Sequence, residues 1–292
     1  MRVTALSDVE PRPRRVAVGE FDGVHIGHRA VIQGNDTVLT FEPHPASVVT
    51  PARAPRLLTS LDLKVELIAG LGVQELVVVP FDASFAAQDA SEFIERVLLG
   101  ALGATHVSVG ENFRFGRGTR GDAAQLAADT RFRTRVVPLV QADGAPVSSS
   151  RIRALVAGGE VEQAAQLLGA PFRMRGEVIT GESRGRGLGF PTANIAPGAE
   201  LVWPGHGVYA CRAGERLAAV NVGVRPTFGD DLAPLVEAYV LDFDGDLYGQ
   251  QLTLEFMARL RGELKFESAA DLVEQMQRDV ERTRELLASG VE

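Results

Sequence analysis

The hydrophobic periodicity of the chain changes once, near residue 171, and this change limits the folds that the chain can adopt. Before it, short apolar runs rich in Val and Leu alternate with segments whose apolar residues recur three and four apart. The first pattern is typical of buried strands and the second of helices. Their alternation indicates a parallel, doubly wound sheet. The expected strands are 16–18, 37–41, 75–80, 106–110 and 135–140, and the expected helices are 60–70 and 91–102.

After residue 171 the chain contains strand-like segments that are separated by Gly, Pro and Asp turns, with no helix between them. This pattern predicts an antiparallel sheet or a small barrel. A last helix, 268–287, has apolar residues at four-residue spacing and is expected to pack on the barrel. A helical segment, 150–168, joins the two halves, so we expect domains at 1–168 and 169–292. The expected strands of the second half are 172–180, 207–213, 216–224, 235–243 and 251–260.

Charge and cysteine content restrict the class of protein. The formal net charge of −8 argues against broad binding to a nucleic-acid backbone, which needs basic patches. The single Cys211 excludes a disulfide within the chain and fits a reducing compartment. No segment resembles a signal peptide or a membrane span. We therefore expect a cytoplasmic protein without nucleic-acid or membrane partners, and a homo-oligomer is left open.

Two histidines, His25 and His28, come shortly after the expected strand 16–18 and lie on either side of Gly27. A strand that ends in a Gly-rich turn before a helix presents backbone N–H groups to an anion, and histidines there can donate to phosphate oxygens. Gly27 would let a phosphate approach the backbone, and Gly23 would support the turn. Two alternatives remain open from the residues alone, namely packing histidines or, with His44, a zinc site.

A set of motifs gives the chain a family resemblance. The first half contains, in order, GVHIGH at 23–28, TFEPHP at 40–45, GENFRFGRGTRGD at 110–122 and VSSSRIR at 147–153. The second half contains GRGLGFPTANI at 185–195, GVYA at 207–210, NVGVRPTFG at 221–229, VEAYVLDFDGDLYG at 236–249 and RLRGELKF at 259–266. The ordered set resembles the bacterial bifunctional riboflavin kinase/FAD synthetases over nearly the whole chain. The resemblance implies an α/β nucleotidyltransferase-like domain that transfers adenylyl groups to FMN, followed by a β-barrel riboflavin kinase domain.

The resemblance implies roles for residues of the first half. In this module the phosphate of FMN attacks the α-phosphorus of ATP and pyrophosphate leaves, so His25 and His28 are expected to stabilise the growing charge together with Mg²⁺. Arg153 is implied as a clamp on the ATP phosphates, although by itself it also fits a solvated helix arginine. Asn112 and Ser149 are implied to bind the nucleotide and the flavin.

In the second half, the γ-phosphate of ATP passes to the 5′-hydroxyl of riboflavin, which requires held phosphates, Mg²⁺ and a proton acceptor. Thr192 and Asn194 are implied as oxygen ligands of Mg²⁺, and Asn194 also as a nucleotide contact. Glu237 is implied as the general base, with a raised pKa expected. Both faces of its strand are apolar, so alternation alone leaves open whether Glu237 faces water. The implied phosphate loop contains Gly185, Gly187 and Gly189.

One segment departs from the family pattern. The connection 28–36 between the histidine turn and the next strand is short for a parallel crossover, which normally needs about a dozen residues. Because the histidines precede it, we expect the turn to survive with a less rigid support behind it. Three hypotheses follow: an enzyme that makes both FMN and FAD, a riboflavin kinase with a degenerate first module, or a non-catalytic flavin-binding protein.

Overall fold

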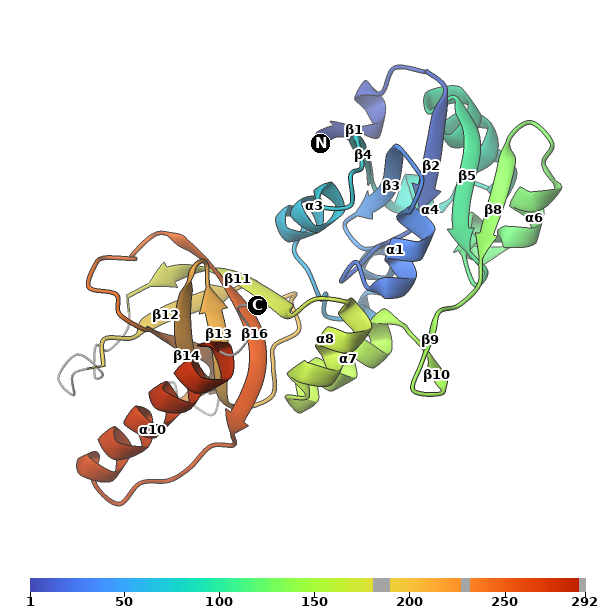
Figure 1. Ribbon diagram of the computed structural model, residues 1–292. Coiled ribbons are helices and arrows are strands. Elements are labelled where there is room, and N and C mark those ends of the chain that lie inside the picture. Colours follow the sequence, from blue (N-terminus) through green and yellow to red (C-terminus); the bar gives the residue numbers. More distant parts are fainter. Residues whose placement is uncertain (181–189, 227–231, 289–292) are drawn as a thin grey trace. The chain divides into compact units, whose positions relative to one another are not determined.

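The computed structural model describes residues 1–180, 190–226 and 232–288, with side chains of 224–234 left undescribed. The chain forms two compact units, Met1–Ser149 and Ser150–Glu292 (Figure 1). The units divide nineteen residues before the domain boundary that the sequence suggested after residue 168, because the helical connection is counted with the second unit. The boundary between independently folding domains stays a prediction.

The first unit is built on a six-stranded sheet with the order β1-β4-β3-β2-β5-β8. All of its strand pairs are parallel. The expected doubly wound sheet is therefore confirmed. Its strands are β1 Arg2–Ala5, β2 Arg14–Val18, β3 Thr37–Glu42, β4 Glu75–Pro80, β5 Ala104–Gly110 and β8 Arg133–Val137. Its helices of four residues or more are α1 Ile26–Ile32, α2 Pro45–Val49, α3 Leu61–Ala69, α4 Ala83–Ala86, the π-helix η3 Phe93–Ala101 and α6 Ala123–Ala128.

Shorter pieces complete the unit. They are α5 Ala90–Glu92, the 3₁₀ turns η1 Leu6–Asp8, η2 Pro51–Arg53 and η4 Arg117–Thr119, and two small hairpins, β6 Arg114–Phe115 with β7 Gly121–Asp122, and β9 Gln141–Ala142 with β10 Ala145–Pro146.

Helices cover both faces of this sheet, which is why its strands are apolar on both sides. On one face, Ala17, Val38 and Leu76 pack against α1 and α3. On the other face, alternate residues of the same strands pack against η3 and α6. The chain therefore leaves β2 on one face, through α1, and returns to β5 on the other face, through η3. This change of face places the switch point of the sheet between β2 and β5.

The short crossover after the histidine turn is complete. Helix α1 has seven residues, and β3 follows it in parallel register with β2, Val16 opposite Thr37 and Val18 opposite Leu39. The apolar residues Val31 and Ile32 at the end of α1 are buried against the sheet. The connection is thus long enough to close the strand–helix–strand unit.

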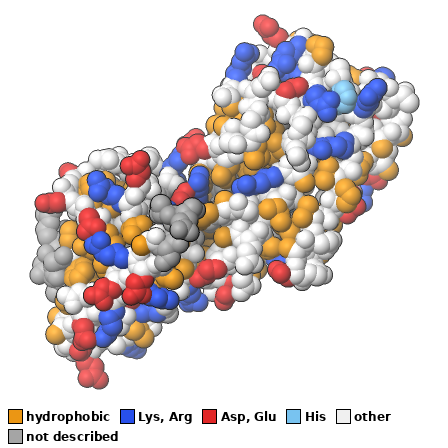
Figure 2. Space-filling model, in the orientation of Figure 1, with side chains coloured by type: hydrophobic (Ala, Val, Ile, Leu, Met, Phe, Trp, Pro, Cys, Tyr) orange, Lys and Arg blue, Asp and Glu red, His pale blue; other side chains and the backbone are white. Residues whose placement is uncertain are grey.

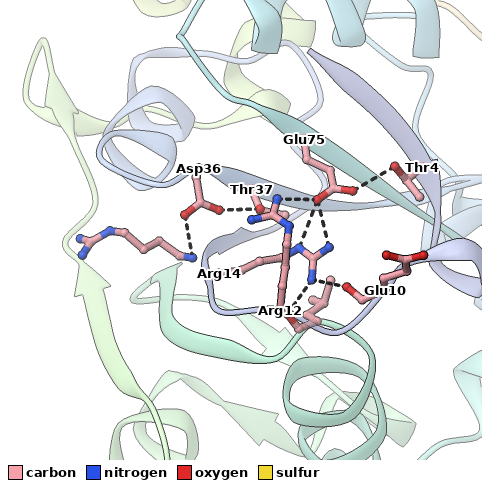
Figure 3. A network of polar contacts seen from close by, with 9 residues as sticks. Thr4, Glu10, Arg12, Arg14, Asp36, Thr37 and Glu75 are labelled. Atoms are coloured by element: carbon pink, nitrogen blue, oxygen red, sulfur yellow. Dashed lines mark hydrogen bonds and ion pairs between the residues drawn. The ribbon is translucent and has the colours of Figure 1, made fainter.

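A buried ionic network ties together the amino ends of the strands (Figure 3). Glu75, at the start of β4, accepts hydrogen bonds from Arg14 Nε (3.1 Å), Arg12 Nη2 (2.9 Å) and Thr4 Oγ1 (3.0 Å). Burial by itself would raise the pKa of Glu75, but these three donors outweigh it and hold the pKa below its ordinary value. The network lies at the sheet edge opposite the histidine turn, so its role is to fix the strands.

The second unit is a closed six-stranded barrel preceded by a helical hairpin and followed by one helix. Its strand pairs are all antiparallel, with the order β11-β12-β15-β14-β13-β16, so the predicted barrel and terminal helix are confirmed. Its elements are α7 Ser149–Gly158, α8 Val161–Leu168, β11 Phe172–Ile179, β12 Ala193–Pro197, β13 Gly207–Ala213, β14 Arg216–Pro226, β15 Leu232–Val240, β16 Gln251–Arg261 and α10 Ala269–Ala288.

Several details differ from the sequence-based expectations. Strands β1 and β12 were not predicted, because each is short and lacks a clear alternation. The strand expected at 135–140 is Arg133–Val137. The helix expected at 91–102 is largely a π-helix, and the segment 150–168 is two helices that are separated where Gly159 has φ +82°. Strands β2 and β5 end at the expected residues, Val18 and Gly110, whereas β15 ends at Val240 and not at 243, and β12, which contains Asn194, was not expected.

Candidate active sites

The histidine turn lies at the carboxyl end of β2, directly beside the switch point of the sheet. The loop that carries Asn112 lies at the carboxyl end of β5, the neighbouring strand. In doubly wound sheets ligands bind at this place, since the two loops leave the sheet in opposite directions and open a crevice. The fold therefore places two of the predicted groups of site residues at adjacent strand ends.

The turn between β2 and α1 has an unusual backbone. Gly23 has φ +82°, and Phe21 and Val24 in the same turn have φ of 52° and 43°. A β-branched residue in the left-handed region is strained, and such strain persists only where surrounding contacts enforce it. Asp22 provides these contacts, because its carboxylate accepts the backbone N–H groups of Leu58 (2.9 Å) and Thr59 (3.1 Å). Position 23 requires a glycine, because a φ of +82° lies in the left-handed region that other residues rarely adopt.

The two histidine rings are stacked, with centroids 3.5 Å apart and planes at 16°. His25 is 5% exposed and caps α1, since its Nδ1 accepts the backbone N–H of His28 at 3.2 Å. An acceptor nitrogen bears no proton, so in the neutral ring the proton of His25 is on Nε2, which is then a donor. The ring of His28 also meets the edge of Phe21, at 5.4 Å between centroids.

Gly27 is also needed for packing at the turn, while its expected role toward a phosphate stays a prediction. A Cβ built on Gly27 would lie 3.1 Å from Cε1 and 3.2 Å from Nδ1 of His25, so any side chain here would press on that ring. The glycine therefore makes room for the cap rather than only for a phosphate. Helix α1 is only seven residues long, so its stability depends on such caps and on packing.

Ser149 is held at the same turn, where its Oγ donates to the carbonyl oxygen of Asp22 at 3.0 Å. Asn112 is exposed in its loop, with its Oδ1 near Gly110. Arg153 is on α7 in the second unit, and its guanidinium donates to Ser150 Oγ at 3.5 Å. The first unit thus brings His25, His28 and Ser149 together, and the binding roles of Asn112, Ser149 and Arg153 stay predictions.

A carboxylate that the sequence analysis did not single out lies beside the turn. Burial raises the pKa of Glu20 to about 8; the Lys64 ammonium lowers it, and the carboxylates of Asp22 and Glu42 raise it. Its Oε2 is buried without a hydrogen-bond partner. A buried acid that lacks a donor is more stable when it is protonated. Glu20 is therefore neutral at and below neutral pH.

We expect Glu20→Gln to change the pH dependence of stability. An acid whose pKa rises on folding destabilises the native state as pH increases from 4.5, its ordinary value, to about 8, where the effect levels off. Glutamine stays neutral, so this decline should vanish. At pH 8 the variant should be more stable by roughly 2–4 kcal/mol, at about 1.4 kcal/mol per unit of pKa with part of the shift relaxed.

The measurement can separate the two units, because Trp203, Tyr209, Tyr239 and Tyr248 make up all the Trp and Tyr of the chain and belong to the second unit. Urea unfolding followed by far-UV circular dichroism reports on both units, whereas fluorescence of Trp203 reports on the barrel. Glu20→Gln should change the pH dependence of the unfolding transition seen by circular dichroism, and leave the transition seen by Trp203 fluorescence unchanged. The exposed Glu10→Gln is the matched control, and an identical pH profile for Glu20→Gln and wild type would contradict the prediction.

The second candidate site is a polar row on the outer face of the barrel. In the strand register, Glu237 of β15 is directly opposite Asn194 of β12 on one side and Asn221 of β14 on the other. Opposite residues of antiparallel strands point to the same face. The intervening Val236 and Ala238 are fully buried inside the barrel. The sequence left open which face of its strand Glu237 is on. In the structure, Glu237 is half-buried on the outer face of β15, a strand that is paired on both sides.

Other predicted kinase residues lie along the same row. Asn194 is only 5% exposed although it is on the outer face. Thr192 is half-buried two residues before it. The ring of Phe190 meets that of Tyr239 at 5.1 Å, next to Glu237 on β15. The glycines of the predicted phosphate loop, Gly185, Gly187 and Gly189, lie outside the described residues.

Sequence reasoning missed Asp22 and Asn221. Asp22 holds the strained turn, and the signal was its place in GEFDG between the strand and the histidines. Asn221 borders Glu237, but only strand register, which the sequence does not reveal, brings it there. Within the part of the chain that the structure describes, no three His, Cys, Asp or Glu side chains are grouped to hold a metal ion, so the zinc alternative has no support there.

On the face in Figure 2, Lys and Arg side chains of the described residues are scattered among apolar and polar ones and do not merge into one basic patch. No helix in residues 1–180, 190–226 or 232–288 combines the length and apolarity needed to cross a bilayer.

Comparisons with known proteins assign a family to each half. The riboflavin kinase family model matches residues 168–287, and the FAD synthetase model matches residues 7–151. The bifunctional riboflavin kinase/FMN adenylyltransferase of Listeria monocytogenes is 39% identical over 94% of this chain and 92% of its own length. The Bacillus subtilis protein of the same name is 36% identical over 90% of this chain and 89% of its own.

A solved structure agrees in fold. A crystal structure of a protein from Streptococcus pneumoniae superposes with a TM-score of 0.87 at 29% identity, covering 97% of this chain and 99% of that one. That protein is named a macrolide-efflux protein. Both family models and both relatives instead point to flavin nucleotide synthesis.

Proposed function

Because the chain belongs to the family of bifunctional riboflavin kinase/FMN adenylyltransferases, we propose that it makes FMN at the outer-face row of the barrel and FAD at the histidine turn. It is an ATP-using enzyme with a kinase module and a nucleotidyltransferase module. The observation that supports the second step most strongly is the intact turn, with its stacked histidines capping a complete crossover. The intact row around Glu237 supports the first step.

For FMN formation, Glu237 accepts the proton of the riboflavin 5′-hydroxyl as its oxygen attacks the γ-phosphorus of ATP. The carboxylate is suited to this role because it is half-buried and has a carboxamide residue opposite it on each neighbouring strand. A positioned base contributes typically 10²–10⁴-fold to the rate. The bond between the γ-phosphorus and the β,γ-bridging oxygen breaks, and ADP leaves.

For FAD formation, the FMN phosphate attacks the α-phosphorus of the second ATP and pyrophosphate leaves. Negative charge grows on the phosphoryl oxygens in the transition state. The Nε2–H of His25 and the ring of His28 stabilise that charge. The strained turn holds the rings in place beforehand, so little reorganisation is needed during the reaction. No covalent enzyme intermediate is required.

Mg²⁺ is proposed as the metal that accompanies ATP. The residues fit this ion, since Thr192 offers a hydroxyl and Asn194 a buried carboxamide oxygen, and Mg²⁺ prefers such hard oxygen donors. When bound, the ion supplies charge neutralisation on the phosphates. Thr192 and Asn194 would hold the ion near Glu237, since Asn194 is directly opposite Glu237 in the strand register. The buried, unpaired Cys211 fits the proposed cytoplasmic location.

The alternatives are separated by one incubation. Purified chain is mixed with riboflavin, ATP and Mg²⁺, and the flavins are resolved by chromatography over time. We expect FMN to appear first and FAD to follow. Accumulation of FMN alone would support the hypothesis of a degenerate first module, and unchanged riboflavin would support a flavin-binding protein. A parallel incubation that starts from FMN isolates the second step.

A further inference from the structure

The strand β8 contains an arginine whose side chain reaches the end of α1. Arg135 Nη2 donates to the carbonyl oxygens of Ala30 (3.1 Å), Val31 (2.8 Å) and Gln33 (2.7 Å). These carbonyls belong to the last turn of α1 or follow it directly. A helix leaves its last four carbonyls without partners inside the helix, and a cation there also complements its dipole.

Two further side chains complete this cap. Asn35 Nδ2 donates to the carbonyls of Val31 (3.0 Å) and Ile32 (3.1 Å). Ser108, which is 4% exposed on β5, links the two caps: its Oγ accepts from Arg135 Nε at 3.2 Å and donates to Asn35 Oδ1 at 3.2 Å. Ser108 and Arg135 are directly opposite in the pairing of β5 with β8, so both side chains leave the same face of the sheet.

This cap supports the short helix α1 behind the histidine turn. Helices much shorter than about a dozen residues are marginal unless tertiary contacts hold them. Helix α1 has seven residues, about 10 Å of axis, with His25 capping its start and His28 in its first turn. A rod this short cannot shift at one end without moving the other. The contacts at the end of α1 come from strands β5 and β8, which lie on the far side of the switch point (Figure 1).

We infer that Arg135, through Ser108 and Asn35, is a positioning residue for FAD formation that compensates for the shortened crossover. The inference rests on the proposed role of the histidine turn. Arg135 touches no reacting atom in this assignment, and it acts by holding the helix end against the sheet. The side chain is itself exposed, so its removal leaves no buried charge and should not unfold the unit.

The test compares Arg135→Gln, Arg135→Lys and wild type in steady-state FAD formation from FMN and ATP. Misplacement of catalytic groups by about an ångström can cost up to 10²-fold, so we expect kcat to fall about 10- to 100-fold in Arg135→Gln. Arg135→Lys retains the charge but not the fork and should lose less. Arg133→Gln, exposed two residues earlier on the same strand, is the matched control and should behave as wild type.

Two readouts distinguish positioning from general destabilisation. Riboflavin phosphorylation by the same molecules should be unchanged, because it uses the barrel. Hydrogen exchange measured by mass spectrometry should accelerate in the peptide covering residues 26–33 and not in β2 or β3. If the wild type makes FAD and Arg135→Gln has the same kcat, the inference about Arg135 is overturned and the proposed function stands. Faster exchange in that peptide with unchanged kcat would also overturn the inference, whereas a wild type that makes no FAD would overturn the proposed function together with it.

Discussion

Glu237→Gln is expected to lower the rate of FMN formation by about 10²–10⁴-fold, the usual contribution of a general base. Glutamine keeps the shape of the side chain and its place between Asn194 and Asn221 but cannot accept the proton of the riboflavin hydroxyl. The measurement is the initial rate of riboflavin phosphorylation at saturating ATP and Mg²⁺. Because the row lies on the outer face of a closed barrel, the substitution leaves the barrel interior unchanged.

The control uses the same chemical change elsewhere in the barrel. Glu177 is exposed on β11, so Glu177→Gln should phosphorylate riboflavin at the wild-type rate. FAD formation from supplied FMN should be unaffected in both variants, since it takes place in the other unit. If Glu237→Gln phosphorylates riboflavin as fast as wild type, Glu237 is not the base.

His28→Ala is expected to remove roughly 2.7–4 kcal/mol of transition-state stabilisation from FAD formation, by analogy with the loss of one oxyanion-type donor. The rate should therefore fall a hundredfold or more on the same analogy. The backbone N–H of residue 28 still donates to His25 Nδ1 in the variant, so the helix cap is retained. Riboflavin phosphorylation should continue at the wild-type rate. Chromatography of the flavins then shows FMN accumulating without FAD.

A second histidine provides the control for this experiment. His106 is at the amino-terminal part of β5, at the opposite edge of the sheet from the turn. His106→Ala should form FAD like wild type. A His28→Ala variant that makes FAD at the wild-type rate would show that the histidine turn does not stabilise the transition state, whatever else it binds.

Parts of both sites follow from local sequence. The Val- and Leu-rich runs that predict β2, β4 and β5 are buried on both faces, and this burial is what makes them readable as parallel strands. Motif order places His25, His28 and Glu237 within their segments. Other residues had no local signal, since Ser108 resembles any strand serine and Arg135 any surface arginine. Their partners lie far away in the sequence: the carbonyls of α1 are 102 to 105 residues from Arg135, and Asn35 is 73 residues from Ser108.

Local periodicity and motif order therefore determined the fold class, the two halves and the family of this protein, since each depends on residues close together in the chain. Tertiary structure decided the rest. Strand register placed Glu237 on the outer face between two asparagines, which alternation could not do because both faces of β15 are apolar. The pairing of β5 with β8 brought Arg135 to the end of α1. Both results depend on hydrogen bonding between distant strands, which the order of residues along one strand does not contain.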